Sequence, residues 1–212
     1  MTDISDSRRE YLSRKLSYKD LNTDPFLQFK KWLNEAYDQN LTDANAMTLA
    51  TSTSDGKPTA RILLLRHWDE KGFVFFTNYE SKKGFQIAEN PWGALVFYWS
   101  LLERQIRIEG KIVKTSREES DDYFDSRPEG SQVGAWASPQ SKKIPSREYL
   151  ESLQEDYIEV FKNSQLKRPI NWGGYRLIPD LFEFWQGREN RLHDRFEYIR
   201  ENGSWSIYRL AP

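Results

Sequence analysis

The sequence predicts a mainly β protein with peripheral helices, in which the strands form one antiparallel barrel. Short segments rich in β-forming residues are separated by tight turns and by few helices, which favours antiparallel pairing over βαβ winding. Asn202-Gly203, between two such segments, is typical of a two-residue hairpin turn. Strand-like segments stand on both sides of a central helical region, so we expect one barrel and one domain over residues 1–212.

The N-terminal half is expected to begin with helix and to continue as strands. Asp24-Pro25 starts a segment whose apolar residues recur at helical spacing, so the first forty residues are expected to be helical. Ser81 is expected to cap a short helix that ends at Asn90-Pro91. The strands expected around this helix cover residues 47–51, 60–68, 73–78, 94–99 and 105–115.

The C-terminal half is expected to hold two helices and then strands again. Ser116 and Glu119 fit a capping box that opens a helix toward Phe124. A second helix is expected after Pro145, where apolar residues form a single stripe. The strands expected after it cover residues 174–178, 181–186, 191–200 and 204–210.

Composition narrows the class of function. Lys and Arg number 31 and Asp and Glu number 32, a formal net charge of −1, which argues against a general nucleic-acid binder. Cysteine is absent and the two histidines are His67 and His193, so disulfides, thiolate nucleophiles and multi-histidine metal sites are excluded, and no metal is expected. No apolar run approaches the roughly 20 residues that span a bilayer, and residues 1–20 contain no secretory signal, so a cytoplasmic location is expected.

The segment that holds Arg191, His193 and Arg195 carries the most chemical information. On a strand these three side chains would lie on one face, because side chains alternate. Three potential cations on one face repel one another unless an anion lies between them. An exposed face with acidic neighbours is the alternative, but for the three together we favour an anion-binding site.

Two further basic clusters are weaker indications of phosphate binding. Lys82 and Lys83 follow Ser81 at a helix start, where backbone N–H groups and Lys side chains together favour a phosphate, although such a pair is often only solvated. Arg61 and Arg66 bracket an apolar strand, either as ordinary exposed ends or as two guanidinium forks for phosphates.

A third cluster combines Tyr123, Arg127 and Ser131 near a helix end, a set that suits a phosphate monoester. Aromatic residues stand beside glycines at 172–175 and 184–187, which indicates either core packing with bulges or walls around a flat ring. Glycine-rich nucleotide loops and a Gly-x-Ser-x-Gly elbow do not occur in the sequence. The residues therefore indicate a small antiparallel β protein that binds phosphorylated, aromatic ligands.

These segments, in this order, resemble the pyridoxamine 5′-phosphate oxidase family over nearly the whole chain. The motifs that carry the resemblance are RILLLR (61–66), FFTNYESKKG (75–84), ERQIRIEG (103–110), YFDSRPEGSQVGAWAS (123–138), WGGY (172–175) and FWQGRENRLHDR (184–195). The resemblance implies an antiparallel, Greek-key type split β-barrel that binds FMN, and a homodimer with the cofactor at its interface. It also implies oxidation of pyridoxamine or pyridoxine 5′-phosphate by hydride removal to the flavin. Dioxygen then reoxidises the flavin and gives hydrogen peroxide, and the product is pyridoxal 5′-phosphate.

The resemblance assigns residues to two ligands. The positions implied for FMN are Arg61, Ile62, Leu63, Leu64, Leu65, Arg66, Phe76, Thr77, Lys82, Lys83, Gln105, Gln140, Ser141, Trp185 and Arg195. The positions implied for the substrate are Arg8, Arg9, Glu10, Tyr11, Arg66, Tyr123, Arg127, Ser131, Arg191, Leu192 and His193. Among these, Arg191 and His193 are implied as the catalytic pair against the pyridine ring, and residues 1–20 as a flexible flap that closes over the site.

Three positions depart from the family pattern. Position 66 is Arg where Lys is frequent, position 82 is Lys where Arg is common, and position 125 is Asp where His is frequent. Each of the first two keeps its charge but changes the geometry of a phosphate contact. Asp125 is expected to face solvent.

Two alternative functions stay open. One is a related split-barrel flavin oxidase that acts on another ring, of the phenazine-biosynthesis type, and the other is a non-catalytic carrier of pyridoxal phosphate. The set Arg66, Tyr123, Arg127 and Ser131 favours the oxidase of phosphorylated substrates, because an unphosphorylated ring does not need it.

Overall fold

A computed structural model describes residues 10–11 and 14–212 of the chain. Its regular elements run from two N-terminal helices through alternating strands and helices to a C-terminal hairpin. They are η1 (Tyr18–Asp20), α1 (Pro25–Asp38), β1 (Ala46–Ser52), β2 (Pro58–Leu64), β3 (His67–Asp69), β4 (Gly72–Asn78), α2 (Lys82–Glu89), β5 (Trp92–Trp99), β6 (Arg104–Lys114), α3 (Arg117–Asp125), α4 (Glu129–Ala137), α5 (Arg147–Phe161), β7 (Trp172–Gln186), η2 (Glu189–Arg191), β8 (Asp194–Glu201) and β9 (Ser204–Leu210).

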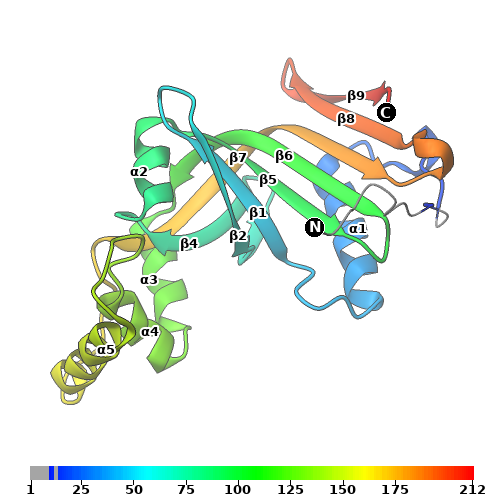
Figure 1. Ribbon diagram of the computed structural model, residues 1–212. Helices are drawn as coiled ribbons and strands as arrows, with labels where there is room; N and C mark the ends of the chain where they lie inside the picture. Colours follow the sequence, from blue (N-terminus) through cyan, green and yellow to red (C-terminus); the bar gives the residue numbers. More distant parts are fainter. Residues whose placement is uncertain (1–9, 12–13) are drawn as a thin grey trace, which may run out of the picture.

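The described strands form one antiparallel sheet of nine strands that curls into a split barrel (Figure 1). The order along the sheet is β2-β1-β5-β6-β7-β4-β3, and β8 and β9 extend it from the second half of β7. The two ends of this order, β2 and β3, follow one another in the chain with only two residues between them. The sheet must therefore curl until its ends meet, as the predicted antiparallel barrel requires.

The strand expected over residues 60–68 is in fact two strands with a corner between them. Strand β2 pairs with β1 and β3 pairs with β4, so the hydrogen bonds change partner at the corner. The Leu65 N–H donates to the Asn45 carbonyl at 2.9 Å, and the Arg66 N–H donates to the Val74 carbonyl at 2.9 Å. Periodicity does not reveal such a change of partner, because both strands remain extended.

Strand β7 is the longest, and it joins the two strands expected at 174–178 and 181–186. Pro179 and Asp180 read as a break in the sequence, but β7 continues through them, and its register with β6 shifts between Glu109 and Gly110. A bulge of this kind bends a strand without ending it. The first part of β7 pairs with β4 and the last part pairs with β8, so one strand connects the two halves of the sheet.

Aromatic side chains fill the inside of the curled sheet. Phe73, Phe182 and Phe184 are fully buried there, and α1 covers them. The Trp32 ring of α1 stands edge-on to Phe184 at 5.3 Å between ring centroids. As predicted, Asp24 caps this helix by accepting a hydrogen bond from the Phe26 N–H at 2.8 Å. These contacts explain much of the aromatic surplus as core packing.

The first forty residues are not helical throughout, contrary to the expectation. Residues 14–17 are without helix and lie along the C-terminal strands. There the Leu16 N–H donates to the Asp194 carboxylate at 3.0 Å. A backbone donor used by a distant carboxylate is not available for a helical hydrogen bond, and this tertiary contact overrides local propensity.

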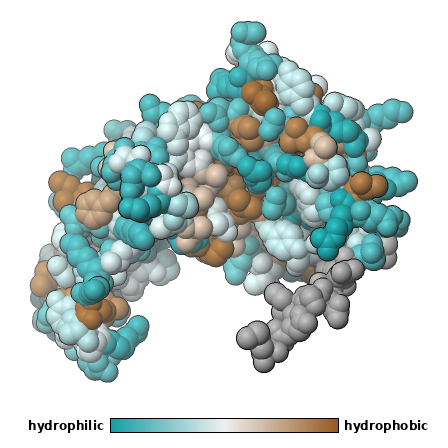
Figure 2. All heavy atoms as spheres, turned by 45° about the horizontal axis from the view of Figure 1, so that its top comes forward, coloured by the Kyte–Doolittle hydropathy of each residue, from teal (hydrophilic) through white to brown (hydrophobic). Residues whose placement is uncertain are grey.

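The predicted caps of α2 and α3 are confirmed: Ser81 accepts from the Gly84 N–H, and Ser116 accepts from the Glu119 N–H at 3.0 Å. The Glu119 carboxylate bonds Arg176 at 2.8 Å, which uses the acid of the expected capping box for a tertiary contact. Helix α4 was not predicted. Helix α5 was predicted, and it packs on α4 through Trp136 as a projection from the barrel (Figure 2). Within the described residues, no helix combines the length and apolar character needed to cross a bilayer.

The C-terminal hairpin has the predicted turn at Asn202-Gly203, both with positive φ, at 49° and 85°. The preceding strand begins at Asp194 and not at residue 191. Asn190 and Arg191 have φ values of 54° and 61°, in the left-handed region, and therefore cannot belong to a strand. The expectation that Arg191, His193 and Arg195 share one strand face is wrong for this reason.

Candidate functional site

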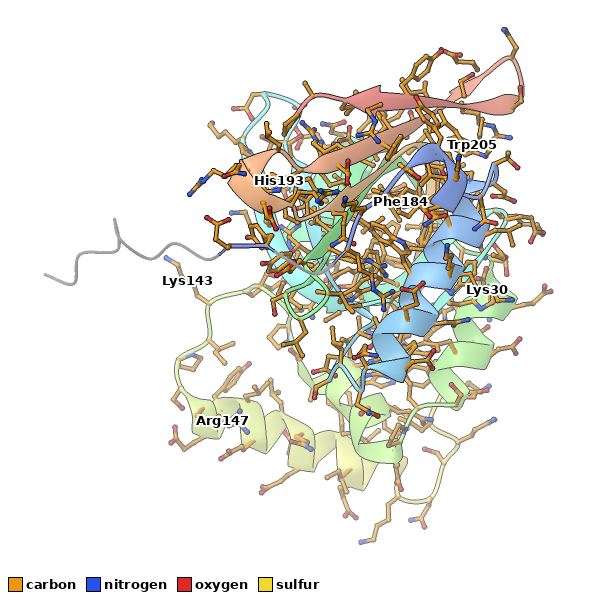
Figure 3. The ribbon with its side chains drawn as sticks, turned by 90° about the vertical axis from the view of Figure 1, so that its right-hand side faces the viewer. Lys30, Lys143, Arg147, Phe184, His193 and Trp205 are labelled. Atoms are coloured by element: carbon orange, nitrogen blue, oxygen red, sulfur yellow. The ribbon has the colours of Figure 1, made fainter. Side chains whose placement is uncertain are left out.

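The residues singled out from the sequence gather in two places at opposite ends of β7. Trp172, the first residue of β7, belongs to one group, and Trp185, near its end, belongs to the other. The strand between them extends over up to about 43 Å at 3.3 Å per residue. Figure 1 shows α3 and α4 beside the first end and η2 at the other, and Figure 3 shows His193 far from Arg147 of α5. One small ligand cannot touch both groups of a single chain.

The first group lines a cleft of about 340 Å³ between β2 and α3, which we call the β2–α3 cleft. Strand β2 supplies its apolar wall, β4 its floor and α3 its far side. Its lining residues are Ile62, Leu63, Leu64, Arg66, Phe76, Thr77, Tyr123, Arg127, Gln140 and Trp172. All but Trp172 were predicted from the sequence for the cofactor or the substrate.

Aromatic rings form one wall of this cleft. The rings of Phe76 and Tyr123 are stacked with centroids 3.8 Å apart, and Trp172 lies nearly parallel to Tyr123 at 6.2 Å. The Arg127 guanidinium lies over the Trp172 ring at 4.5 Å. The glycines after Trp172 were the available signal for it, since they let α3 and β4 approach closely. A Cβ on Gly173 would lie 3.0 Å from the Ser120 hydroxyl of α3, and a Cβ on Gly174 would lie 2.9 Å from the Phe76 ring of β4.

Arg127 is a partly buried cation in this cleft with an unused donor. Its Nη1 atom is buried and has no hydrogen-bond partner among the described residues. Burial lowers the pKa of Arg127; the charge of Tyr123 raises it, and the nearby charge of Arg66 lowers it further. Two cations with a buried unpaired N–H between aromatic walls are suited to an anion.

Lys83 forms a second cationic point next to the cleft. Its Nζ donates to the hydroxyl of Thr77 at 3.0 Å, to Ser81 at 3.3 Å and to the Gln140 side-chain oxygen at 3.0 Å. All three partners are neutral, although Lys83 is only 7 % exposed. Burial lowers the pKa of Lys83 to about 8, and the charge of Arg61 contributes in the same direction.

Arg61 is held in place by neutral oxygens as well. It donates to the Leu49 carbonyl at 3.1 Å, to the Thr51 hydroxyl at 2.7 Å and to the Thr59 hydroxyl. Both hydroxyls in turn donate to the Gln86 side-chain oxygen at 2.7 Å. Burial lowers the pKa of Arg61. The three supporting polar residues were not predicted, since hydroxyl and amide residues on strands and helices are too common to stand out.

Other predicted residues lie at the margins of the cleft. Lys82 and Ser141 line a neighbouring hollow of about 360 Å³. Ser131 is exposed in the first turn of α4, and the Leu65 side chain is buried in the core, so that only its backbone can face a ligand. Asp125 is exposed, as expected, and faces the opposite side of α3 in a separate hollow of about 680 Å³.

The second group is a row across β6, β7 and β8. Gln105 pairs with Trp185, and Trp185 pairs with Arg195, so their side chains share the outer face of the sheet. The Arg195 side chain is ion-paired with Glu183 at 2.9 Å, and the Arg195 Nη1 donates to the Ala211 carbonyl at 2.8 Å. Arg195 therefore has a carboxylate partner, and the expectation of three uncompensated cations is wrong at this residue.

His193 completes the second group. Its ring lies 4.7 Å from Trp185 and 5.5 Å from Tyr11, measured between ring centroids. The backbone N–H of Arg188 donates to His193 Nδ1 at 3.1 Å, which assigns the proton of the neutral ring to Nε2. Burial lowers the pKa of His193, and the charge of Arg191 lowers it further.

The remaining predicted residues of this end are surface residues or outside the structure. Arg191, Leu192 and Glu10 are exposed. Arg8 and Arg9, predicted for the substrate, lie outside the described residues. In the described part of the expected flap, Tyr11 contacts the site, edge-on to Trp185 at 5.6 Å. The motifs therefore assign to one site residues that lie in two separate groups within a single chain.

Comparison with known proteins agrees with the motifs. Residues 33–158 match the family model described as pyridoxamine 5′-phosphate oxidase, and residues 172–212 match the pyridoxine 5′-phosphate oxidase C-terminal dimerisation region. The chain is 52% identical, over the full length of both proteins, to the pyridoxine/pyridoxamine 5′-phosphate oxidase of Cupriavidus pinatubonensis.

Solved structures show the same fold. PhzG from Burkholderia lata, solved in complex with tetrahydrophenazine-1-carboxylic acid, is 31% identical with a TM-score of 0.88, covering 94% of this chain and 99% of PhzG. An FMN-binding, pyridoxamine 5′-phosphate oxidase-related protein from Nostoc punctiforme is 19% identical with a TM-score of 0.71, covering 91% and 100%. The expected split barrel, the oxidoreductase class and the use of FMN are thereby confirmed. The chain belongs to the pyridoxamine 5′-phosphate oxidase family of FMN-dependent oxidoreductases.

Proposed function

We propose that the protein oxidises pyridoxine 5′-phosphate and pyridoxamine 5′-phosphate to pyridoxal 5′-phosphate with dioxygen. The alcohol and one O₂ give the aldehyde and one H₂O₂; the amine additionally consumes one water and releases ammonia. The observation that carries the proposal is the buried Nη1 of Arg127 in the β2–α3 cleft, beside Arg66 and Tyr123, which has no hydrogen-bond partner among the residues that the structure describes. A phosphate on the substrate supplies the acceptor that this N–H lacks. We assign Ser131, on the next helix, to the same phosphate.

FMN is assigned to the Lys83 side of the cleft. Within the described parts of the chain, the cations Lys83 and Arg61 have only neutral hydrogen-bond partners, so a phosphate dianion fits between them, and the aromatic wall suits a flat ring. When bound, FMN supplies the redox chemistry, accepting a hydride from the substrate and passing electrons to dioxygen. The chain itself binds the two phosphates, orients the rings and excludes water.

The second group of residues is assigned to the site of the other subunit. In one chain His193 and Arg127 lie at opposite ends of β7, and the C-terminal region of this chain matches the family's dimerisation region. A two-fold axis can bring the His193 end of one subunit to the cleft of the other. We therefore propose a homodimer in which each FMN contacts both chains, through Gln105, Trp185 and Arg195 of one and the cleft of the other.

His193 and Arg191 are assigned to the substrate ring. The neutral His193 already accepts a hydrogen bond at Nδ1, so it faces a ligand as a donor from Nε2 and not as a base. Arg191 is exposed and supplies a cation next to it. Tyr11 packs edge-on against the His193 ring and is assigned to cover the substrate. These residues orient the substrate so that its 4′-carbon faces the flavin.

A phenazine-type oxidation is the second candidate, because PhzG, whose structure holds a tetrahydrophenazine carboxylic acid, has a very similar fold. The two functions differ in the anion that the cations of the cleft bind. A carboxylic acid brings one charge, whereas a phosphate monoester brings nearly two and three acceptor oxygens. The pair Arg66 and Arg127 with Tyr123 favours the phosphate. A carrier of pyridoxal phosphate, the third candidate, needs no flavin.

An anaerobic reduction experiment tests the proposal. The FMN-loaded protein is mixed with pyridoxine 5′-phosphate, with unphosphorylated pyridoxine or with a dihydrophenazine carboxylic acid, and flavin absorbance is followed. We expect rapid bleaching by the phosphorylated compound alone. Preferred bleaching by the phenazine contradicts the proposal in favour of the second candidate, and no bleaching by any compound favours the carrier.

The pKa of Lys83 predicts a pH dependence of FMN binding. Phosphate binding holds the ammonium protonated, so the affinity is expected to be retained below pH 8 and to fall above it. The fall should be about tenfold per pH unit while Lys83 alone titrates. Titration of the apoprotein with FMN between pH 7 and pH 10, followed by flavin fluorescence, measures this. In the Lys83→Arg variant the fall should vanish, since Arg stays charged; an equal fall in both proteins assigns it to another group.

A further inference from the structure

We infer that Glu183 is a positioning residue for FMN binding, and that it acts by holding the Arg195 guanidinium. The inference rests on the proposed assignment of Arg195 to FMN. Glu183 lies in β7, on the same outer face as Trp185, and is only 3 % exposed. It contributes no predicted ligand contact of its own, and the motifs did not single it out.

Glu183 lies between two arginines from neighbouring strands. Arg195 of β8 donates to it from Nε at 3.2 Å and from Nη2 at 2.9 Å, while Arg107 of β6 donates to it from Nη1 at 3.1 Å. Arg107 is in turn paired with Glu109. This row of alternating charges crosses the sheet and fixes Arg195 from one side.

The hydrogen bonds determine which donors of Arg195 remain available. A guanidinium has five N–H donors in one plane. Two are used by Glu183, and a third, on Nη1, is used by the Ala211 carbonyl. Among the described residues, one N–H on Nη1 and one on Nη2 are without a partner. These two donors remain for the oxygen or nitrogen atoms of a ligand.

Burial of Glu183 is not explained by stability alone. Taking a carboxylate out of water costs free energy, and apolar side chains in place of a buried ion pair are often as stable or more stable. The hydrogen bonding of Arg195 to the Glu183 carboxylate is the largest cause of the raised pKa of Arg195. The carboxylate therefore keeps this guanidinium oriented before any ligand arrives, which lowers the entropy lost on binding.

The test compares Glu183→Gln with Glu197→Gln. Glu197 lies directly opposite Glu183 on β8 and also raises the pKa of Arg195 through its charge, so the control removes the same charge from the same pair of strands. In Glu183→Gln, one acceptor oxygen is replaced by an NH₂ group that faces the N–H donors of Arg195. We expect FMN binding, measured by fluorescence titration, to weaken at least tenfold in Glu183→Gln and less than threefold in Glu197→Gln.

Two further measurements separate positioning from mere stability. Glu183→Asp keeps the charge and should recover part of the affinity. In an Arg195→Gln background, Glu183→Gln should have no further effect on FMN binding, because the residue through which it acts is gone. Equal affinity of Glu183→Gln and Glu197→Gln, or independent effects of the two positions, overturns the inference. If Glu183→Gln does not fold, the same comparison is made with Glu183→Asp. Failure of the wild-type protein to bind FMN overturns instead the proposed function.

Discussion

Replacing Arg127 with alanine is expected to lower kcat/KM for pyridoxine 5′-phosphate about 100-fold while FMN remains bound. The substitution removes the buried Nη1 donor that has no partner within the described part of the chain. A charge-assisted hydrogen bond to a buried phosphate is worth about 3 kcal/mol, which corresponds to a factor of roughly 100. Most of the loss should appear in KM, because the phosphate lies away from the reacting carbon and binds equally in the ground and transition states.

The matched control is Arg117→Ala. Arg117 is the first residue of α3, the helix that ends just before Arg127, but its side chain is 89% exposed, so its removal should leave the kinetics unchanged. Unphosphorylated pyridoxine provides a second control, since its slower oxidation should be equally fast in wild type and Arg127→Ala. An equal loss with this substrate would mean that Arg127 acts by supporting the Trp172 ring and not by binding phosphate.

Mixing two inactive variants is expected to restore activity. Arg127→Ala damages the cleft, whereas Arg191→Ala damages the group at the other end of β7, and we expect each homodimer to lose about 99% of its activity while retaining FMN. In a mixed dimer, one of the two shared sites receives both wild-type residues. Random exchange of subunits makes half of the dimers mixed, so about a quarter of wild-type activity should return.

The outcome separates two arrangements of the site. Activity is measured after denaturing and refolding the two variants together, with each variant refolded alone as the control. If each site were built from one chain only, every chain in the mixture would still carry one damaged residue, and activity would stay at the level of the parents. Loss of FMN from Arg191→Ala would show that this residue contacts the cofactor and not the substrate.

Local sequence signals predicted those elements that depend on local contacts. The turn at Asn202-Gly203 and the caps at Ser81 and Ser116 are confirmed because each is made by residues at most three positions apart. Helix α4 was missed because it follows Pro128 without a side-chain cap and contains two glycines, Gly130 and Gly134, which disfavour helix. The strand proposed over 191–200 failed at Arg191, where the backbone is left-handed and no β-propensity applies.

The candidate site shows the same division. The sequence placed Lys83 and Arg127 among phosphate-binding residues from their motifs. It did not reveal that both are partly or largely buried cations without carboxylate partners in the described structure. It also treated Arg195 as a free cation, since Glu183 and the Ala211 carbonyl reach it only through strand pairing. Burial and pairing of charges are set by tertiary contacts, which a motif does not encode.

The order of strands in the sheet determines how this protein can fold. Strands β8 and β9 are joined by a two-residue turn and can pair rapidly, whereas the connection between β6 and β7 covers residues 115–171. Closing a connection of this length costs more chain entropy than a hairpin, and helices α3, α4 and α5 all lie within it. Arg127 lies within this connection and Trp172 follows it, whereas the cleft also needs β2 and β4, so the anion-binding cleft is complete only when the connection has packed onto the sheet.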